Sequence, residues 1–128
     1  MKLLLDTHSL LWMLADVESL SDTARRAIRD PENVLLASIA SYWEIGFKVS
    51  IGKLALREDW QESIPRELTR NRVEWLPISV AHVNEVSSLP WHHRDPFDRL
   101  LLAQARVDGL HLVSGDGQFD AYGVSLVW

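Results

Sequence analysis

Residues 3–8 read LLLDTH, a run of three leucines that ends in an acid. An apolar run this short, closed by a polar residue, is typical of a strand that is buried in a parallel sheet. Three further segments have the same character, and a last short one lies near the C-terminus. They are VLLA at 34–37, EWLPI at 74–78, LHLV at 110–113 and VSLV at 124–127.

The segments between these strands predict helices. Helical patterns cover residues 9–15, 41–49, 59–72, 80–86 and 95–107, and a further helix runs from residue 22 up to a stop at Pro31. Pro65 is expected to kink or split the helix over 59–72. Strands that alternate with helices predict an α/β sandwich with a mainly parallel central sheet. The 128 residues, with no repeat or linker, suit one domain over 1–128.

Composition limits the function classes. Hydrophobic residues make up 47% of the chain and charged ones 24%, ordinary values for a soluble globular protein. The absence of cysteine excludes disulfides and thiolate metal sites, and it favours a cytoplasmic location. The apolar run at the N-terminus is too short for a signal peptide or a membrane span. The net charge of −5 means that RNA binding would need local basic patches or a basic partner.

Four acids fall near the same expected edge of the sheet. They are Asp6 at the end of the first strand, Glu44 in the helix after the second, Asp98 in the first turn of the helix before the fourth, and Asp116 just past the fourth. Active sites of parallel α/β sheets lie beyond the carboxyl ends of the strands, so these side chains can meet. Convergent carboxylates repel one another unless a cation binds. The sequence therefore predicts a Mg²⁺ or Mn²⁺ centre that activates water for attack on a phosphate.

Each of these acids also has a structural explanation. Asp6 could cap the following helix, and Asp116 lies between two glycines as turn residues often do. Glu44 could complete a capping box with Ser41 or form an ion pair with Lys48. It is the conjunction of the four positions that favours a shared site.

Residues around Asp98 leave a second choice of ligand. Asp98 lies where an acid favours the helix dipole, and Asp95 could be the ligand instead. Pro96 fits the position that follows a cap, which favours Asp95 as the helix cap. The five histidines lack metal-ligand spacing, and a loop role is favoured for His92 and His93, which could also touch substrate. No serine–histidine pair, Walker loop or HExxH motif competes for the chemistry.

Four motifs, in this order, resemble those of the PIN-domain family, and within it the VapC-type toxins of bacterial and archaeal toxin–antitoxin pairs. They are LLLDTH at 3–8, SIASYWEIGFKVSIGKL at 38–54, HRDPFDRLLLAQA at 93–105 and LVSGDGQFDAYGV at 112–124. The resemblance runs from end to end of the chain. It implies a PIN-like three-layer α/β/α sandwich, in agreement with the alternation of strands and helices.

The resemblance also implies an activity and a set of partners. The catalytic and metal-binding quartet would be Asp6, Glu44, Asp98 and Asp116, with Thr7 and Ser114 as supporting polar residues. The implied activity is Mg²⁺- or Mn²⁺-dependent cleavage of RNA by an endoribonuclease. The implied partners are a second copy in a homodimer and a cognate antitoxin, through which alone the chain would meet DNA. No membrane partner is expected.

Basic and aromatic residues provide further candidates. Arg94 and Arg99 flank Asp98 and could contact phosphates, with Lys48 and Lys53 as a second pair, although solvated surface charges are the favoured alternative. Three of the six tryptophans, Trp12, Trp43 and Trp60, fall in helices. Burial is expected for each, with a dimer or antitoxin surface as the alternative.

Two rival functions stay open at this point. One is a binding module with little nuclease activity that acts through an antitoxin–DNA complex, and the presence of all four acids disfavours it. The other is a different Mg²⁺-dependent phosphoryl-transfer enzyme. An aspartyl phosphatase would usually carry a second Asp two residues after the first, where this chain has His8.

Overall fold

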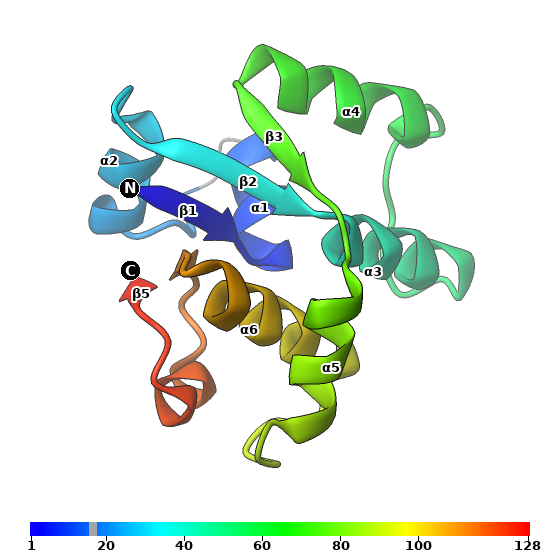
Figure 1. Ribbon diagram of the computed structural model, residues 1–128. Coiled ribbons are helices and arrows are strands. Elements are labelled where there is room, and N and C mark those ends of the chain that lie inside the picture. The colour runs from blue at the N-terminus through cyan, green and yellow to red at the C-terminus, as the bar shows by residue number, and fades with distance from the viewer. Residues whose placement is uncertain (16–17) are drawn as a thin grey trace.

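The computed structural model describes residues 1–15 and 18–128, with a parallel sheet at its centre (Figure 1). The strand order is β3-β2-β1-β4-β5. The strands are β1 (Lys2–Leu5), β2 (Val34–Ser38), β3 (Val73–Leu76), β4 (His111–Val113) and β5 (Leu126–Val127). Every pair of neighbours is parallel, so the predicted α/β sandwich is confirmed and the described sheet is wholly rather than mainly parallel.

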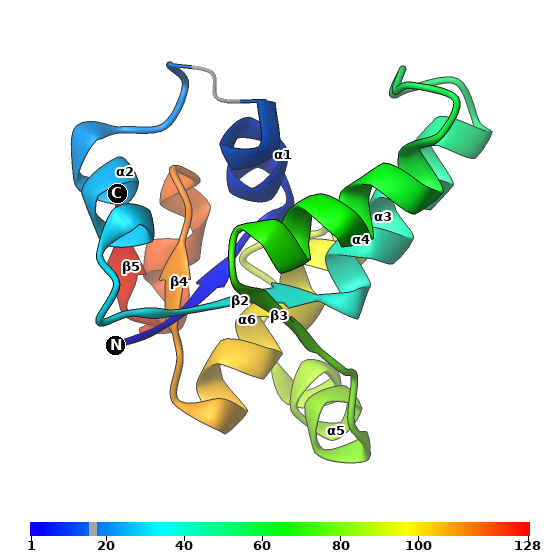
Figure 2. The ribbon, with the colours of Figure 1, turned by 90° about the horizontal axis from the view of Figure 1, so that it is seen from above.

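Helices cover both faces of the sheet. They are α1 (Thr7–Ala15), α2 (Asp22–Arg29), α3 (Ile39–Ser50), α4 (Trp60–Arg70), α5 (Val80–Ser88) and α6 (Pro96–Asp108), followed by the 3₁₀ helix η1 (Gly117–Tyr122). Figure 2 shows α1 and α4 on one side of the sheet and α5 and α6 on the other. This arrangement confirms the three layers that the resemblance implied.

The side chains of β1 explain why both faces are covered. Successive residues of a strand point to opposite faces. Leu4 packs in one buried cluster with Leu101 and Leu112, whereas Leu3 and Leu5 pack in a second one, beneath α1, α2 and α4. All three leucines are fully buried. A strand apolar at every position is therefore stable only with helices on both sides.

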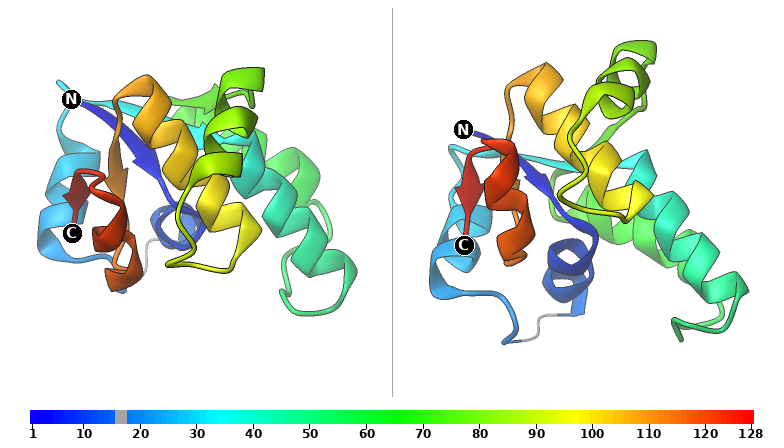
Figure 3. Two further views of the ribbon diagram at one scale, coloured as in Figure 1. Left: turned by 60° about the horizontal axis from the view of Figure 1, so that its bottom comes forward. Right: turned by 90° about the horizontal axis from the view of Figure 1, so that it is seen from below.

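The chain reverses its direction of travel across the sheet at β1. β2 and β3 lie to one side of β1, and β4 and β5 lie to the other. In parallel sheets such a switch point leaves a crevice beyond the carboxyl ends of the two strands that flank it. Figure 3 shows α3 running outward from the end of β2, beside the start of α6, at this same edge.

Some local expectations need correction. Helix α4 is a single element through Pro65, rather than being split there. The proline lacks the N–H that would bond the carbonyl of Gln61, and the hydroxyl of Tyr42 lies 3.5 Å from that carbonyl instead. Helix η1 begins at the last residue of the predicted turn at 115–117 and continues to Tyr122, where the sequence predicted no helix. No helix among the described residues is long and apolar enough to cross a membrane.

Candidate active site

Asp6 lies where β1 passes into α1. Its backbone N–H donates to the carbonyl of Val113 at 3.1 Å, which extends the pairing of β1 with β4 by one residue. One carboxylate oxygen, Oδ1, accepts a hydrogen bond from the N–H of Ser9 at 2.8 Å. The side chain therefore caps α1, as the structural alternative proposed, and it lies at the carboxyl edge of the sheet with only 6% of its surface exposed.

Glu44 is buried on α3 and has a partner on each oxygen. The hydroxyl of Thr7 donates to Oε1 at 2.6 Å, and the ammonium of Lys48 lies 2.6 Å from Oε2. The expected ion pair with Lys48 is thus present. The capping box with Ser41 is wrong, because Ser38 caps α3 by accepting from the N–H of Ala40. Thr7 links the start of α1 to α3 and fixes the orientation of the Glu44 carboxylate.

Asp98 lies in the first turn of α6. Asp95 caps this helix as predicted, because its Oδ1 accepts from the N–H groups of Phe97 and Asp98 at 2.8 and 3.2 Å. The pKa of Asp98 is raised from 3.8 to about 8, first by burial and then by negatively charged neighbours. These neighbours are, in order of effect, Asp95, Glu44, Asp6 and Asp116. The other three predicted acids therefore lie close enough to Asp98 to act on it through space.

Asp116 follows β4 and caps η1. Its Oδ1 accepts from the N–H of Gln118 at 2.9 Å. The buried hydroxyl of Ser114 accepts from the backbone N–H of Asp116 at 3.1 Å, which shapes the turn between them. Ser114 therefore supports the position of Asp116 through the backbone, and the carboxylate of Asp116 remains partly exposed.

His93 is a member of this cluster that the sequence reasoning missed. Its Nε2 lies 3.2 Å from Oδ2 of Asp98 and 3.1 Å from Oδ2 of Asp116. Among the described residues, these three form the one group of histidines and acids whose atoms lie close enough together to hold an ion. The available signal was position, since His93 lies two residues before the Asp95 cap.

Lys48 is the cation that the acid cluster faces in this structure. Its hydrogen bond to Glu44 raises the pKa of the ammonium, burial lowers it, and the charges of Glu44, Asp95 and Asp98 raise it again. Several carboxylates that lie close together suit a hard divalent cation such as Mg²⁺ or Mn²⁺, which prefers oxygen ligands. The residues present thus fit a metal of this class.

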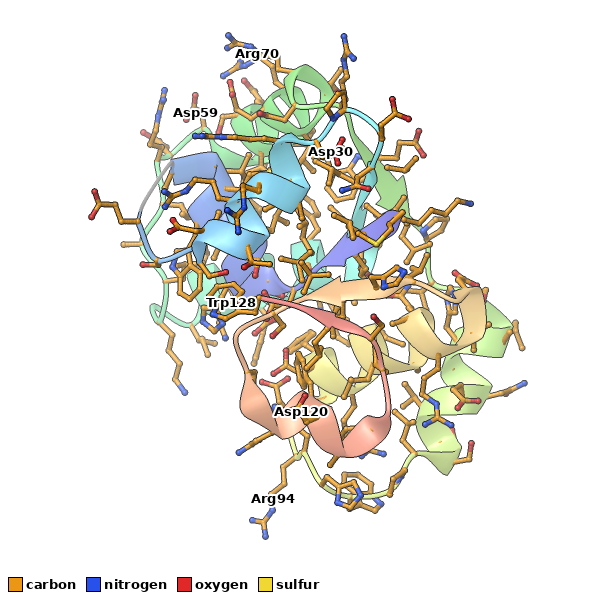
Figure 4. All side chains as sticks on the ribbon, turned by 90° about the vertical axis from the view of Figure 1, so that its left-hand side faces the viewer. Asp30, Asp59, Arg70, Arg94, Asp120 and Trp128 are labelled. Carbon is orange, nitrogen blue, oxygen red and sulfur yellow. The ribbon has the colours of Figure 1, made fainter. Side chains whose placement is uncertain are left out.

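Arg99 is buried, which contradicts the exposed position assumed both for a phosphate contact and for a solvated surface charge. The residue is 3% exposed. Its guanidinium donates to the backbone carbonyls of Pro90 at 2.8 Å and of Val86 and Leu89 at 3.2 Å each. The ring of Trp91 lies over it at 3.8 Å. The guanidinium points inward, where this loop presents several backbone carbonyls to it. Arg94, in contrast, points away from the fold in Figure 4.

Burial of all three helical tryptophans was also expected, and Trp43 departs from it. Its side chain is 60% exposed on α3, and its ring packs edge-on against Phe97 with centroids 4.8 Å apart. Phe47, one turn further along α3, contacts the same ring of Phe97. An exposed aromatic surface therefore lies beside the start of α6.

Comparisons with known proteins agree with this architecture. The family model of the PIN domain matches residues 3–124. No curated protein sequence matches the chain. One similar structure is a chain of VapBC2 from Rickettsia felis, in a crystal structure bound to a DNA fragment from the VapBC2 promoter. It superposes with a TM-score of 0.72 and 16% sequence identity, over 98% of this chain and 97% of that chain.

Two further solved structures share the fold. One is VapBC-1 from nontypeable Haemophilus influenzae, with a TM-score of 0.69 and 16% identity over 98% of this chain and 96% of that one. The other is a toxin–antitoxin complex from Klebsiella pneumoniae, with a TM-score of 0.63 and 19% identity over 98% and 95%. Identities this low establish similarity of fold.

Proposed function

The chain belongs to the PIN domain family, and from this premise we propose that it is a metal-dependent endoribonuclease that acts as the toxin of a toxin–antitoxin pair. PIN domains are nucleases, which hydrolyse phosphodiester bonds. The proposal narrows this activity to RNA as the substrate and to Mg²⁺ or Mn²⁺ as the cofactor.

The observation that carries the proposal is the concentration of negative charge at the carboxyl edge of the sheet. The pKa of about 8 at Asp98 reflects its burial and the four other carboxylates that act on it. Such a cluster opposes folding unless a cation compensates for it. Lys48 supplies one positive charge, at Glu44. A divalent cation would compensate for two more of these negative charges.

The four acids would hold this cation, directly or through water: Asp6, Glu44, Asp98 and Asp116. A bound ion of this kind would supply a Lewis acid that activates a water molecule and stabilises the charge that develops on the phosphate. The protein's own contribution is orientation. Thr7 holds one oxygen of Glu44, and the N–H of Ser9 holds one oxygen of Asp6. Ser114 shapes the turn that presents Asp116.

The partners are proposed by analogy with proteins of the same fold. These include a toxin–antitoxin complex and a VapBC2 structure bound to promoter DNA. We expect a cognate antitoxin, a homodimer, and contact with DNA through the antitoxin alone. Exposed aromatic side chains on α3, Trp43 and Phe47, offer an apolar surface suited to protein contacts.

Two isosteric variants test the nuclease activity. Asp6→Asn and Asp98→Asn chains are expected to fold and to lose Mn²⁺-dependent cleavage of RNA, because each lacks one negatively charged ligand. Asp120→Asn is the matched control, since Asp120 is an exposed acid on η1 (Figure 4). Cleavage is measured on purified RNA, and sequencing of RNA ends after brief expression identifies the substrate. Wild-type cleavage rates in both site variants would refute the mechanism.

A further inference from the structure

His93 bridges two acids that come from different parts of the fold. Asp98 is presented by the first turn of α6, and Asp116 by the turn between β4 and η1. Nε2 of the buried imidazole lies 3.2 Å from Oδ2 of the first and 3.1 Å from Oδ2 of the second. These distances allow two different roles, since Nε2 could donate a proton to both oxygens or could coordinate an ion with them.

The other ring nitrogen decides between these roles. The backbone N–H of Asp95 points at Nδ1 of His93 and donates to it at 3.1 Å. Nδ1 must therefore present its lone pair, and the ring proton lies on Nε2. A nitrogen that carries a proton has no lone pair for a metal. We infer that His93 is a positioning residue, which donates Nε2–H to the carboxylates of Asp98 and Asp116, and that it is not a metal ligand.

The backbone of His93 is held as firmly as its ring. Its N–H donates to the hydroxyl of Tyr122 at 2.8 Å, and that hydroxyl donates to the carbonyl of Pro90 at 2.9 Å. The guanidinium of Arg99 donates to the carbonyl of His93 at 3.4 Å. The imidazole is thus anchored from α6 and from η1, the two elements whose acids it joins. This explains what the buried Arg99 does near the site.

The bridge fixes the geometry of the site before any ion binds. A shared donor holds together two carboxyl groups that repel each other once both are ionised. With the donor present, Oδ2 of each acid is held by the same nitrogen. Hydrogen-bond partners that orient metal ligands change metal affinity by about 10- to 100-fold when they are removed. This role rests on the proposed function, because it assumes that the acids bind a metal.

The unaltered protein provides the first test. In the protein labelled with ¹⁵N-histidine, NMR spectra of the imidazole groups are expected to show the His93 ring proton on Nε2, both without metal and after saturation with Mg²⁺. The His93→Gln spectrum assigns the signal. A proton on Nδ1, or loss of the Nε2 proton when Mg²⁺ binds, would overturn the inference. This test stands even if a variant does not fold.

Metal affinity provides the second test, by calorimetric titration with Mn²⁺. His93→Leu removes the donor and should bind Mn²⁺ at least about tenfold more weakly than the wild type. His93→Gln keeps an N–H at the end of a similar side chain and should stay within about threefold of the wild type. His92→Leu, at the exposed neighbouring histidine, is the control and should leave the affinity unchanged.

Wild-type affinity in His93→Leu would overturn the positioning role, as would a Gln variant no better than the Leu variant. A wild-type chain that binds no Mn²⁺ would instead contradict the proposed function. The imidazole spectra would still decide in that case whether His93 donates to the two acids. Failure of the inference and failure of the proposed function are therefore distinguishable.

Discussion

Replacing Asp98 with asparagine is expected to stabilise the metal-free protein, by an amount that grows with pH. The pKa of Asp98 in the folded chain is raised from 3.8 to about 8, first by burial and then by the charges of Asp95 and Glu44 among others. The folded state therefore binds this proton more tightly than the unfolded state. The stability that the proton contributes is fully present below about pH 4 and is lost as the pH rises through about 8.

The size of the effect follows from the same two pKa values. A shift of one unit corresponds to about 1.4 kcal/mol. From about pH 4 to about pH 7, the wild-type chain should lose about 1.4 kcal/mol of unfolding free energy per pH unit through this group, or about 4 kcal/mol in all. The side chain is 22% exposed, and contact with solvent makes this figure an upper limit. Asparagine does not ionise, so the variant lacks this slope.

Urea unfolding, followed by tryptophan fluorescence in the presence of EDTA, measures the difference. The gap between Asp98→Asn and the wild type should widen steadily between about pH 4 and about pH 7. Asp120→Asn, at an exposed acid on η1, is the matched control. Saturating Mn²⁺ should stabilise the wild type more than the Asp98 variant. Parallel stability curves for Asp98→Asn and the wild type would refute the reasoning.

Two further substitutions test the basic residues. Lys48→Met should tighten Mn²⁺ binding about fivefold, or about 1 kcal/mol, because the ammonium 2.6 Å from Glu44 competes with the metal; weaker binding by calorimetry would count against this competition. Arg99→Met should lower the free energy of unfolding by about 3 kcal/mol, because it removes a buried guanidinium that donates to the carbonyls of Val86, Leu89 and Pro90. If urea unfolding were unchanged and the salt dependence of RNA binding fell, the residue would instead act on RNA.

The strands and helices were predictable because burial on two faces leaves a strong pattern. LLL at residues 3–5 is apolar at every position, and the structure buries all three side chains between two helical layers. Element ends were predicted less well. Helix α1 begins at Thr7, directly after Asp6, because the Asp6 carboxylate caps it and no separate turn is needed. A short 3₁₀ helix such as η1 has too few residues to show a periodic pattern of apolar side chains in the sequence.

The grouping of the acids was predictable from topology, and the partners of the basic side chains were not. Each acid follows a strand or begins a helix near a strand, so the order of elements alone brings them to one edge. Arg99 follows Asp98 in the sequence, but this position does not tell whether its side chain points outward or inward. Its direction is set by carbonyls of residues 86–93, which only the folded loop brings within reach. His93 was missed for the same reason.

The segment from His93 to Asp98 depends on its length as much as on its residue types. The N–H of Asp95 reaches back to the His93 ring, Oδ1 of Asp95 reaches forward to the N–H of Asp98, and the Asp98 carboxylate returns to His93. Inserting one residue after Asp95 would turn Asp98 by about 100° around the helix axis and open this circuit. Most segments of a chain need only suitable side chains. This segment also needs a fixed number of residues between His93 and Asp98. Natural variation in this segment should therefore take the form of exchanged side chains at constant spacing.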